Sequence, residues 1–277
     1  MSSAQNLVLS VCGAMPSVGE RVDAVIMNFP SGCEPHIKIS DSRVEGNEVT
    51  VFCRTRNLQD LFLCFLAKDA LERKGATKVH LYIPYLPFAR QDRVMVDGEP
   101  LSIKVLANII NSQGFSSVSI LDPHSDVSPA LIDRCKIAYN YLWHYALSGK
   151  KRHLLVSPDA GAYKKVSKIA SSIKGHDGIV VCQKTRDVAT GQLTGFEVDS
   201  PLIRGRECFI LDDICDGGGT FVGIAEALIS RGAEAVYLVV THGIFSKGVN
   251  ALVGIDHIYT TNSFQDVNHN KVTQYKI

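Results

Sequence analysis

The chain lacks long hydrophobic runs and an excess of either charge. Its longest apolar runs, such as residues 61–67 and 235–240, fall far short of the roughly 20 residues that a membrane-spanning helix needs. Lysine and arginine together number 29 against 28 aspartates and glutamates, which gives a net charge of +1. Nucleic-acid-binding domains are usually much more basic. We therefore expect neither a membrane nor a nucleic acid as a partner.

Paired cysteine motifs are also missing. None of the eight cysteines stands in a CxxC pair or at the spacing of a zinc site. Several lie inside apolar runs, where a free thiol behaves as a small hydrophobic group. The opening residues MSSAQNLVLSVCGAM contain an apolar stretch without a basic flank, so no signal peptide is expected. This pattern fits a reducing, cytoplasmic compartment.

Strand-like and helix-like segments alternate along the chain, which predicts an α/β fold with mainly parallel sheets. The length of 277 residues favours two domains, with a seam near residues 147–152. Strands are predicted at residues 49–53, 79–83, 118–121, 154–157, 179–182, 208–211, 236–240 and 258–260. Helices are predicted at residues 60–74, 102–113, 162–172, 220–231 and 246–252.

Glycines mark the ends of several predicted elements. Gly75, Gly114 and Gly232 follow three of the helices, at the position where glycine commonly ends a helix. Residues 183–206 are polar, include Gly191 and Gly195, and lack a long apolar stripe. We expect this segment to be a mobile excursion from the sheet.

The segment ILDDICDGGGT, residues 210–220, is the most informative part of the sequence. A buried strand is followed by Asp212 and Asp213, then by Asp216, three glycines and the start of a helix. Glycines bring backbone N–H groups close to a ligand, and a helix N-terminus adds partial positive charge, so this turn suits a phosphate. The paired carboxylates suit sugar hydroxyls or a magnesium ion. The combination predicts a phosphoribosyl site, in preference to an ordinary turn with solvated acids.

Polar side chains also follow other predicted strands. In SPDAGA, residues 157–162, a strand end leads into a second turn and helix, and Lys164 and Lys165 stand in the first helical turns. Cations are unusual there unless an anion is nearby. His124 lies between two acids in LDPHSD, and Arg90 opens the sequence RQDR. Taken alone, RQDR is more often a solvated loop, and a single histidine in a loop is usually a hydrogen-bonded surface group.

Four motifs in order resemble ribose-phosphate pyrophosphokinase, also called PRPP synthetase. They are YIPYLPFARQDR (82–93), LDPHSD (121–126), VSPDAGAYKKV (156–166) and THGIFS (241–246), and the 210–220 segment is similar to the PRPP-binding loop of type I phosphoribosyltransferases. The resemblance runs from about residue 29 to 262. It implies two similar phosphoribosyltransferase-like α/β domains, each a mainly parallel sheet flanked by helices. Residues 1–147 would carry the ATP-binding elements, and residues 148–277 the ribose 5-phosphate and pyrophosphate loops.

The resemblance also implies a reaction. The β,γ-diphosphoryl group of ATP would pass to the C1 hydroxyl of ribose 5-phosphate, giving PRPP and AMP, with Mg²⁺ as cofactor. The protein would be a homo-oligomer, a dimer or a multiple of dimers. ATP binding is implied for Arg90, Gln91, His124 and, from a neighbouring subunit, Phe29.

Residue roles in the second half follow from the same resemblance. Ribose 5-phosphate would be held by Asp212, Asp213, Asp216, Gly217, Gly218, Gly219 and Thr220, with the carboxylates on the 2- and 3-hydroxyls and the loop on the 5-phosphate. The pyrophosphate loop would be Asp159, Ala160, Gly161 and Ala162, and His124 and Asp159 would place Mg²⁺. Because Mg²⁺ prefers oxygen ligands, a contact from His124 to phosphate or to metal-bound water stays open. Lys184 and Arg186 would neutralise the transition state as catalytic residues.

Two other functions stay open. A phosphoribosyltransferase that consumes PRPP would share the 210–220 loop but would not need the elements at Arg90 and His124. A non-catalytic regulatory subunit should have lost loop cations or glycines, and Lys184, Arg186 and the three glycines are intact.

The chain departs from the family pattern at three places. Ala162 stands where the family has a second glycine, and Glu34 is displaced by one residue from the family's acid after Phe29. Residues 94–99, VMVDGE, replace a polar, basic run. Since phosphate binding needs convergent cations, regulation by ADP at a separate site is expected to be weak or absent.

Overall fold

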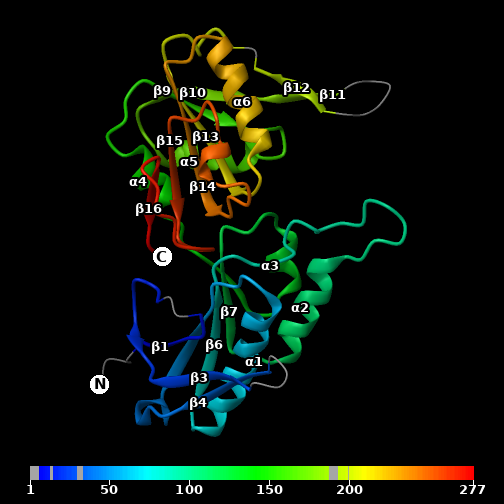
Figure 1. The fold of residues 1–277 in the computed structure, drawn as a ribbon, viewed down its shortest axis with the longest axis vertical. Helices are drawn as coiled ribbons and strands as arrows, with labels where there is room; N and C mark the ends of the chain where they lie inside the picture. The colour runs from blue at the N-terminus through cyan, green and yellow to red at the C-terminus, as the bar shows by residue number, and fades with distance from the viewer. Residues whose placement is uncertain (1–5, 13–14, 30–33, 187–192, 199) are drawn as a thin grey trace. The chain divides into compact units, whose positions relative to one another are not determined.

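The computed structural model describes residues 6–12, 15–29, 34–198 without 187–192, and 200–277. These residues form two compact units. The first runs to Tyr139 and includes Lys276–Ile277, and the second is Asn140–Tyr275. The two units are shown along the chain in Figure 1.

The first unit is built on a parallel six-stranded sheet in the order β2-β1-β5-β6-β7-β8. The strands are β1 (Leu7–Ser10), β2 (Glu20–Arg21), β5 (Glu48–Phe52), β6 (Lys78–Ile83), β7 (Ser117–Leu121) and β8 (Cys135–Ala138). The helices are η1 (Ser42–Val44), α1 (Leu58–Arg73), α2 (Ser102–Ser112) and α3 (Val127–Leu131). A separate antiparallel hairpin joins β3 (Ala24–Phe29) to β4 (Glu34–Ile39), and α1 packs on it as well as on the sheet.

The second unit has its own parallel sheet, in the order β10-β9-β13-β14-β15-β16. Its strands are β9 (His153–Ser157), β10 (His176–Val181), β13 (Glu207–Cys215), β14 (Ala235–Gly243), β15 (His257–Thr261) and β16 (Val272–Tyr275). The helices are α4 (Leu142–Leu147), α5 (Tyr163–Ser172), α6 (Gly219–Ser230) and η2 (Val249–Ala251). The hairpin of β11 (Gln183–Arg186) and β12 (Leu193–Glu197) lies beside α6 (Figure 1).

The second sheet is buried on both faces, which explains its apolar strands. Along β13, Cys208 and Ile210 pack into the core that contains α6, whereas Phe209 and Leu211 pack into the core that contains α4 and α5. Successive side chains of a strand point to opposite faces, so a strand covered on both sides must be apolar throughout. This is why the sequence pattern located the central strands.

The predicted fold class, two α/β domains with parallel sheets, is confirmed. All eight predicted strands and four of the five predicted helices are present within a few residues. Gly75, Gly114 and Gly232 have φ of 91°, 67° and 84° just beyond their helices, as a glycine at a helix end requires.

The predicted helix at 246–252 is wrong, because only the short 3₁₀ helix η2 forms there. Phe245 and Gly248 have left-handed φ values of 47° and 77°, which a continuous right-handed helix does not allow. The polar segment 183–206 contains the hairpin β11–β12, which the sequence did not predict.

The chain passes between the units at Tyr139–Asn140, whereas the sequence placed the seam at residue 147. Helix α4 belongs to the second unit because Leu142 and Trp143 are buried in its core. No helix among the described residues is long and apolar enough to cross a membrane.

Candidate active site

The two adjacent acids lie inside a strand, not after it. The sequence ended the strand at Leu211, but β13 continues to Cys215 because β14 pairs with it that far. On its other side β13 pairs with β9 only as far as Ile210. The part of β13 that carries Asp212 and Asp213 therefore extends past β9, above the loop that follows β9.

The two carboxyl groups of this pair interact directly. The Asp213 N–H donates to Asp212 Oδ1 at 2.8 Å, and Asp213 is only 5% exposed. Burial raises the pKa of Asp212 well above its ordinary value, and the hydrogen bond and charge of Asp213 raise it further. Asp212 therefore holds a proton more strongly than an isolated aspartate does.

The glycine-rich turn leads directly into helix α6. Gly218 is the N-cap residue with φ of 77°, a left-handed conformation that side chains disfavour. A Cβ at Gly218 would lie 2.3 Å from Leu252 Cδ2, whereas a Cβ at Gly219 would meet nothing within 4 Å. No side chain caps α6. The Phe221 N–H donates to the Gly218 carbonyl at 3.0 Å, which leaves the N–H groups of Gly219 and Thr220, at the start of the helix, for a ligand.

A second segment holds this turn in place. The N–H groups of Ile244 and Phe245 donate to the Cys215 carbonyl at 2.9 and 3.1 Å, and that of Ser246 donates to the Asp216 carbonyl at 3.2 Å. Cys215 is itself buried, and burial together with nearby acids raises the pKa of its thiol to about 12. Although Cys215 lies in the proposed loop, its thiol belongs to the core.

The loop after β9 is organised by Asp159. Its Oδ1 accepts a hydrogen bond from the Ala162 N–H at 3.0 Å, and Ser157 Oγ donates to its carbonyl at 2.8 Å. Helix α5 begins at Tyr163 with Ala162 as its N-cap, at φ −76°. Alanine adopts this conformation without strain, so the departure from the family's glycine costs no backbone energy.

Lys165 links the two turns. From the first turn of α5, its Nζ lies 3.9 Å from Asp213 Oδ1. Its positive charge lowers the pKa of Asp212, opposing burial and Asp213. Lysines 164 and 165 indicated a nearby anion in the sequence, and for Lys165 one such anion is a carboxylate of the protein. Strand order brings them together, because β9 lies next to β13.

The hairpin β11–β12 is anchored on α6. Phe196, opposite Lys184 in the hairpin register, packs against Gly223, where a Cβ would lie 2.5 Å from its ring. The backbones of Lys184 and Arg186 belong to β11, and their side chains lie outside the described residues. The sequence gave no sign of the anchor, which requires an aromatic ring on β12 opposite a glycine on α6.

In the first unit, the loops after the adjacent strands β6 and β7 meet. Arg90, Gln91 and His124 are exposed on these loops. Burial raises the pKa of Asp92, but a hydrogen bond from Ser125 and the charges of Arg93 and His124 outweigh it and lower that pKa. Asp92 therefore ties the RQDR loop to the loop of His124.

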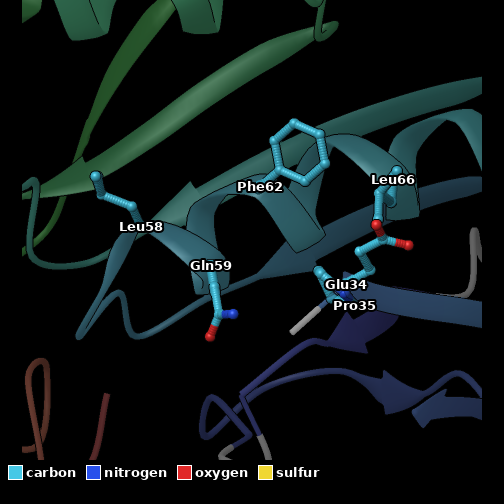
Figure 2. A pocket seen from close by; sticks show the side chains of 6 residues that line it. All are labelled: Glu34, Pro35, Leu58, Gln59, Phe62 and Leu66. Atoms are coloured by element: carbon cyan, nitrogen blue, oxygen red, sulfur yellow. The ribbon is translucent and has the colours of Figure 1, made fainter. Parts of the chain in front are cut away.

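Phe29 is the last residue of β3, and its side chain lies outside the described residues. Nearby, a hollow of about 550 Å³ opens between the start of β4 and the first turns of α1. Figure 2 shows its lining, mostly apolar, with Phe62 and Leu66 on α1 and Pro35 on β4. Glu34, which the sequence analysis compared with the family's acid after Phe29, also lines this hollow.

Residues 2–114 match the model of the N-terminal domain of ribose phosphate pyrophosphokinase, and residues 131–276 match that of the phosphoribosyl transferase domain. The ribose-phosphate pyrophosphokinase of Hyphomonas neptunium is 30% identical, over 83% of this chain and 76% of its own. That of Maricaulis maris is 32% identical, over 77% of this chain and 70% of its own. The chain belongs to the ribose-phosphate pyrophosphokinase family.

The fold agrees with this membership. The crystal structure of phosphoribosylpyrophosphate synthetase from Mycobacterium smegmatis matches with a TM-score of 0.81, covering 98% of this chain and 94% of that one at 24% identity. In this member of the family, the structure brings the acid pair, the glycine turn and the loop of Asp159 to neighbouring strands of one unit. Arg90, Gln91 and His124 lie on neighbouring loops of the other.

Proposed function

We propose that the protein is an enzyme that transfers the β,γ-diphosphoryl group of ATP to the C1 hydroxyl of ribose 5-phosphate, giving PRPP and AMP. Family membership over both halves of the chain supports this reaction. The structural observation that carries it is the contact between Lys165 and Asp213. It joins a turn suited to a diphosphate to a turn suited to a sugar phosphate, as a diphosphoryl transfer to a sugar requires.

The second unit would hold ribose 5-phosphate. Asp212 and Asp213 would hydrogen-bond the 2- and 3-hydroxyls, and residues Asp216, Gly217, Gly218, Gly219 and Thr220 would hold the 5-phosphate. The uncapped N-terminus of α6 supports the second assignment, because its N–H groups and helix dipole favour an anion. The position of the adjacent acids on β13 supports the first, because carboxylate oxygens accept hydrogen bonds from sugar hydroxyls.

The first unit would hold ATP through Arg90, Gln91 and His124, with Phe29 supplied by a second copy of the chain. Lys184 and Arg186 would stabilise the charge of the transferring group, since positioned cations act mainly on charge that develops in the transition state. The sugar hydroxyl needs no strong base if its partners are held in line.

Magnesium fits the donor set. Mg²⁺ usually binds one or two carboxylates together with substrate phosphates. Asp159 offers a carboxylate at the start of α5, with Oδ1 engaged by its own loop. Among the described residues no group of three or more His, Cys, Asp or Glu side chains forms a cage, so substrate oxygens would complete the shell. The bound ion would neutralise phosphate charge, and His124 would contact it directly or through water.

The family membership also supports proposals about the cellular compartment and the oligomeric state. The protein would work in the cytoplasm, in keeping with the seven described cysteines, all of which are free. It would assemble as a homo-oligomer, a dimer or a multiple of dimers. A phosphoribosyltransferase is disfavoured because residues 2–114 match a domain of ribose phosphate pyrophosphokinase.

The decisive experiment follows the diphosphoryl group. The protein is incubated with Mg²⁺, ribose 5-phosphate and ATP labelled at the β-phosphorus, and the products are separated. We expect unlabelled AMP and labelled PRPP in equal amounts, and neither when ribose 5-phosphate is omitted. Formation of ADP instead would show a simple kinase. Consumption of added PRPP with a purine base would show a phosphoribosyltransferase.

A further inference from the structure

Lys247 lies beside the glycine-rich turn although it comes from a different part of the chain. It belongs to the connection between β14 and η2, some 30 residues after the turn. An ideal Cβ on Gly217 would lie 3.5 Å from Lys247 Cε and 3.7 Å from its Cδ. The lysine stem therefore lies alongside Gly217, at van der Waals distance from the position that a Cβ would take.

The backbone around Lys247 is fixed against the turn. Three hydrogen bonds from residues 244–246 to the carbonyls of Cys215 and Asp216 hold the segment on one side. Phe245 is buried with a left-handed φ of 47°, and the Gly248 N–H donates to its carbonyl at 2.8 Å. Lys247 thus starts from a backbone position set by the turn itself.

The ammonium group is available to a ligand. Lys247 is exposed, and among the described residues its ammonium forms no hydrogen bond or ion pair. The turn has no cation of its own: residues 210–220 contain three aspartates and no lysine or arginine, and Asp216 could offer a phosphate dianion only its backbone N–H. Lys165 already lies against Asp213.

We propose that Lys247 binds the 5-phosphate of ribose 5-phosphate, as a phosphate ligand supplied from outside the glycine-rich turn. Its ammonium adds a charged hydrogen-bond donor to the backbone N–H groups at the start of α6. The lysine stem runs beside Gly217, which places Lys247 next to the turn. This inference rests on the proposed function only in placing the 5-phosphate at this turn.

Binding can be measured without turnover. Isothermal titration calorimetry with ribose 5-phosphate compares the wild type with Lys247→Met, which keeps the stem and removes the charge, and with Lys247→Arg, which keeps a charge. Lys174→Met is the matched control. Lys174 is exposed and precedes β10, so it lies at the amino ends of the strands, whereas Lys247 follows the carboxyl end of β14. Each titration is repeated at low and high salt.

Lys247→Met should weaken binding of ribose 5-phosphate by about tenfold, the scale of one hydrogen bond to a charged group, and reduce the salt dependence. Lys247→Arg should bind within about threefold of wild type, and Lys174→Met should bind as wild type does. Equal binding by wild type and Lys247→Met, equal losses in the Met and Arg variants, or no binding by wild type would overturn the proposal. If binding depends on Lys247 but no AMP forms in the labelled-ATP assay, the proposed reaction fails and this inference stands.

Discussion

The N-termini of helices α1 and α6 follow parallel strands in the same way but are completed differently. In α1, the Asn57 side chain accepts from the Asp60 N–H at 2.9 Å, and Asp60 accepts from the Asn57 N–H at 3.3 Å. This capping box satisfies the first turn from within the sequence. In α6, the N-cap is Gly218, and no side chain caps the turn.

The difference separates a structural helix from one that serves a ligand. A capping side chain typically stabilises a helix by about 1 kcal/mol, and α6 forgoes that contribution. Its exposed N–H groups remain for a phosphate. Helix α5, with Ala162 at its N-cap and no side-chain cap of that kind, resembles α6 in this respect. Both α5 and α6 follow loops assigned to substrate, whereas α4 also lacks a side-chain cap and follows no such loop, so a missing cap marks a ligand site only together with the residues of the loop before it.

The largest effect should come from the acids beside the uncapped helix. Asp212→Asn combined with Asp213→Asn should lower turnover by at least about 10²–10³-fold, because preorganised polar contacts are lost, and should leave the fold intact. AMP formation and thermal unfolding measure the two properties. Asp60→Asn, at the capped helix, is the control and should lower stability without lowering turnover. Wild-type turnover in the double variant would remove the acid pair from the site.

The next effect should come from the cations of β11. Lys184→Ala and Arg186→Ala should each lower kcat by about 10²–10³-fold and change KM much less, because the charges are proposed to act in the transition state. Lys78→Ala is the control, since Lys78 forms an exposed ion pair with Glu48, and such pairs contribute little. A raised KM with unchanged kcat would make the cations binding groups only.

Gly218 and Gly219 provide a matched pair within the turn. Gly218→Ala should destabilise the protein by about 1–3 kcal/mol through backbone strain, with a further cost from the clash with Leu252, and should lower turnover because the turn must shift. Gly219→Ala meets open space and should leave stability unchanged. Thermal unfolding and initial rates of both variants are the measurements. Equal destabilisation by the two variants would contradict the described turn.

The reverse test removes the cap of α1. Asn57→Ala should cost about 1 kcal/mol of stability and leave kcat and both KM values unchanged, because α1 is proposed to bind no substrate. Urea unfolding monitored by circular dichroism gives the first quantity and AMP formation the others. A loss of activity without a loss of stability would show that the N-terminus of α1, like that of α6, takes part in substrate binding.

The smallest effect concerns His153, the first residue of β9. It lies at the amino ends of the strands of the second sheet, whereas the proposed substrate loops follow their carboxyl ends. Among the described residues neither ring nitrogen of this fully buried histidine has a hydrogen-bond partner. Burial lowers its pKa below the ordinary 6.5, and the nearby His176 lowers it further. The unfolded chain therefore binds a proton near pH 6.5 that the folded protein does not, so stability falls as pH drops below about 6.5.

His153→Leu should remove part of this pH dependence and raise stability by up to about 1 kcal/mol, since relief of two unbonded nitrogens is partly offset by loss of the ring contact with Phe209. Urea unfolding between pH 5 and pH 8 measures both. An unchanged slope in the variant would place the titrating group elsewhere.

Some of the elements that the sequence missed have weak local patterns. Strand β8 reads CKIA with no buried residue, and β16 is half-buried throughout. Each is a strand because a parallel neighbour pairs with it, and strand preference depends strongly on such context. The incorrect helix at 246–252 has the same origin, because residues 244–246 donate their hydrogen bonds to the turn at 215–216 instead.

The sequence by itself determined the fold class, the central strands and the segments that carry the chemistry. It could do so because apolar strands buried on two faces, helix-ending glycines and the strand–turn–helix at 210–220 are local patterns. The family resemblance added the residue roles, which stay predictions. Tertiary structure alone decided which residues meet: Lys165 with Asp213, Asp92 with Ser125, and Lys247 with Gly217. The physical reason is that strand order within a sheet places distant segments side by side, and no local pattern records that order.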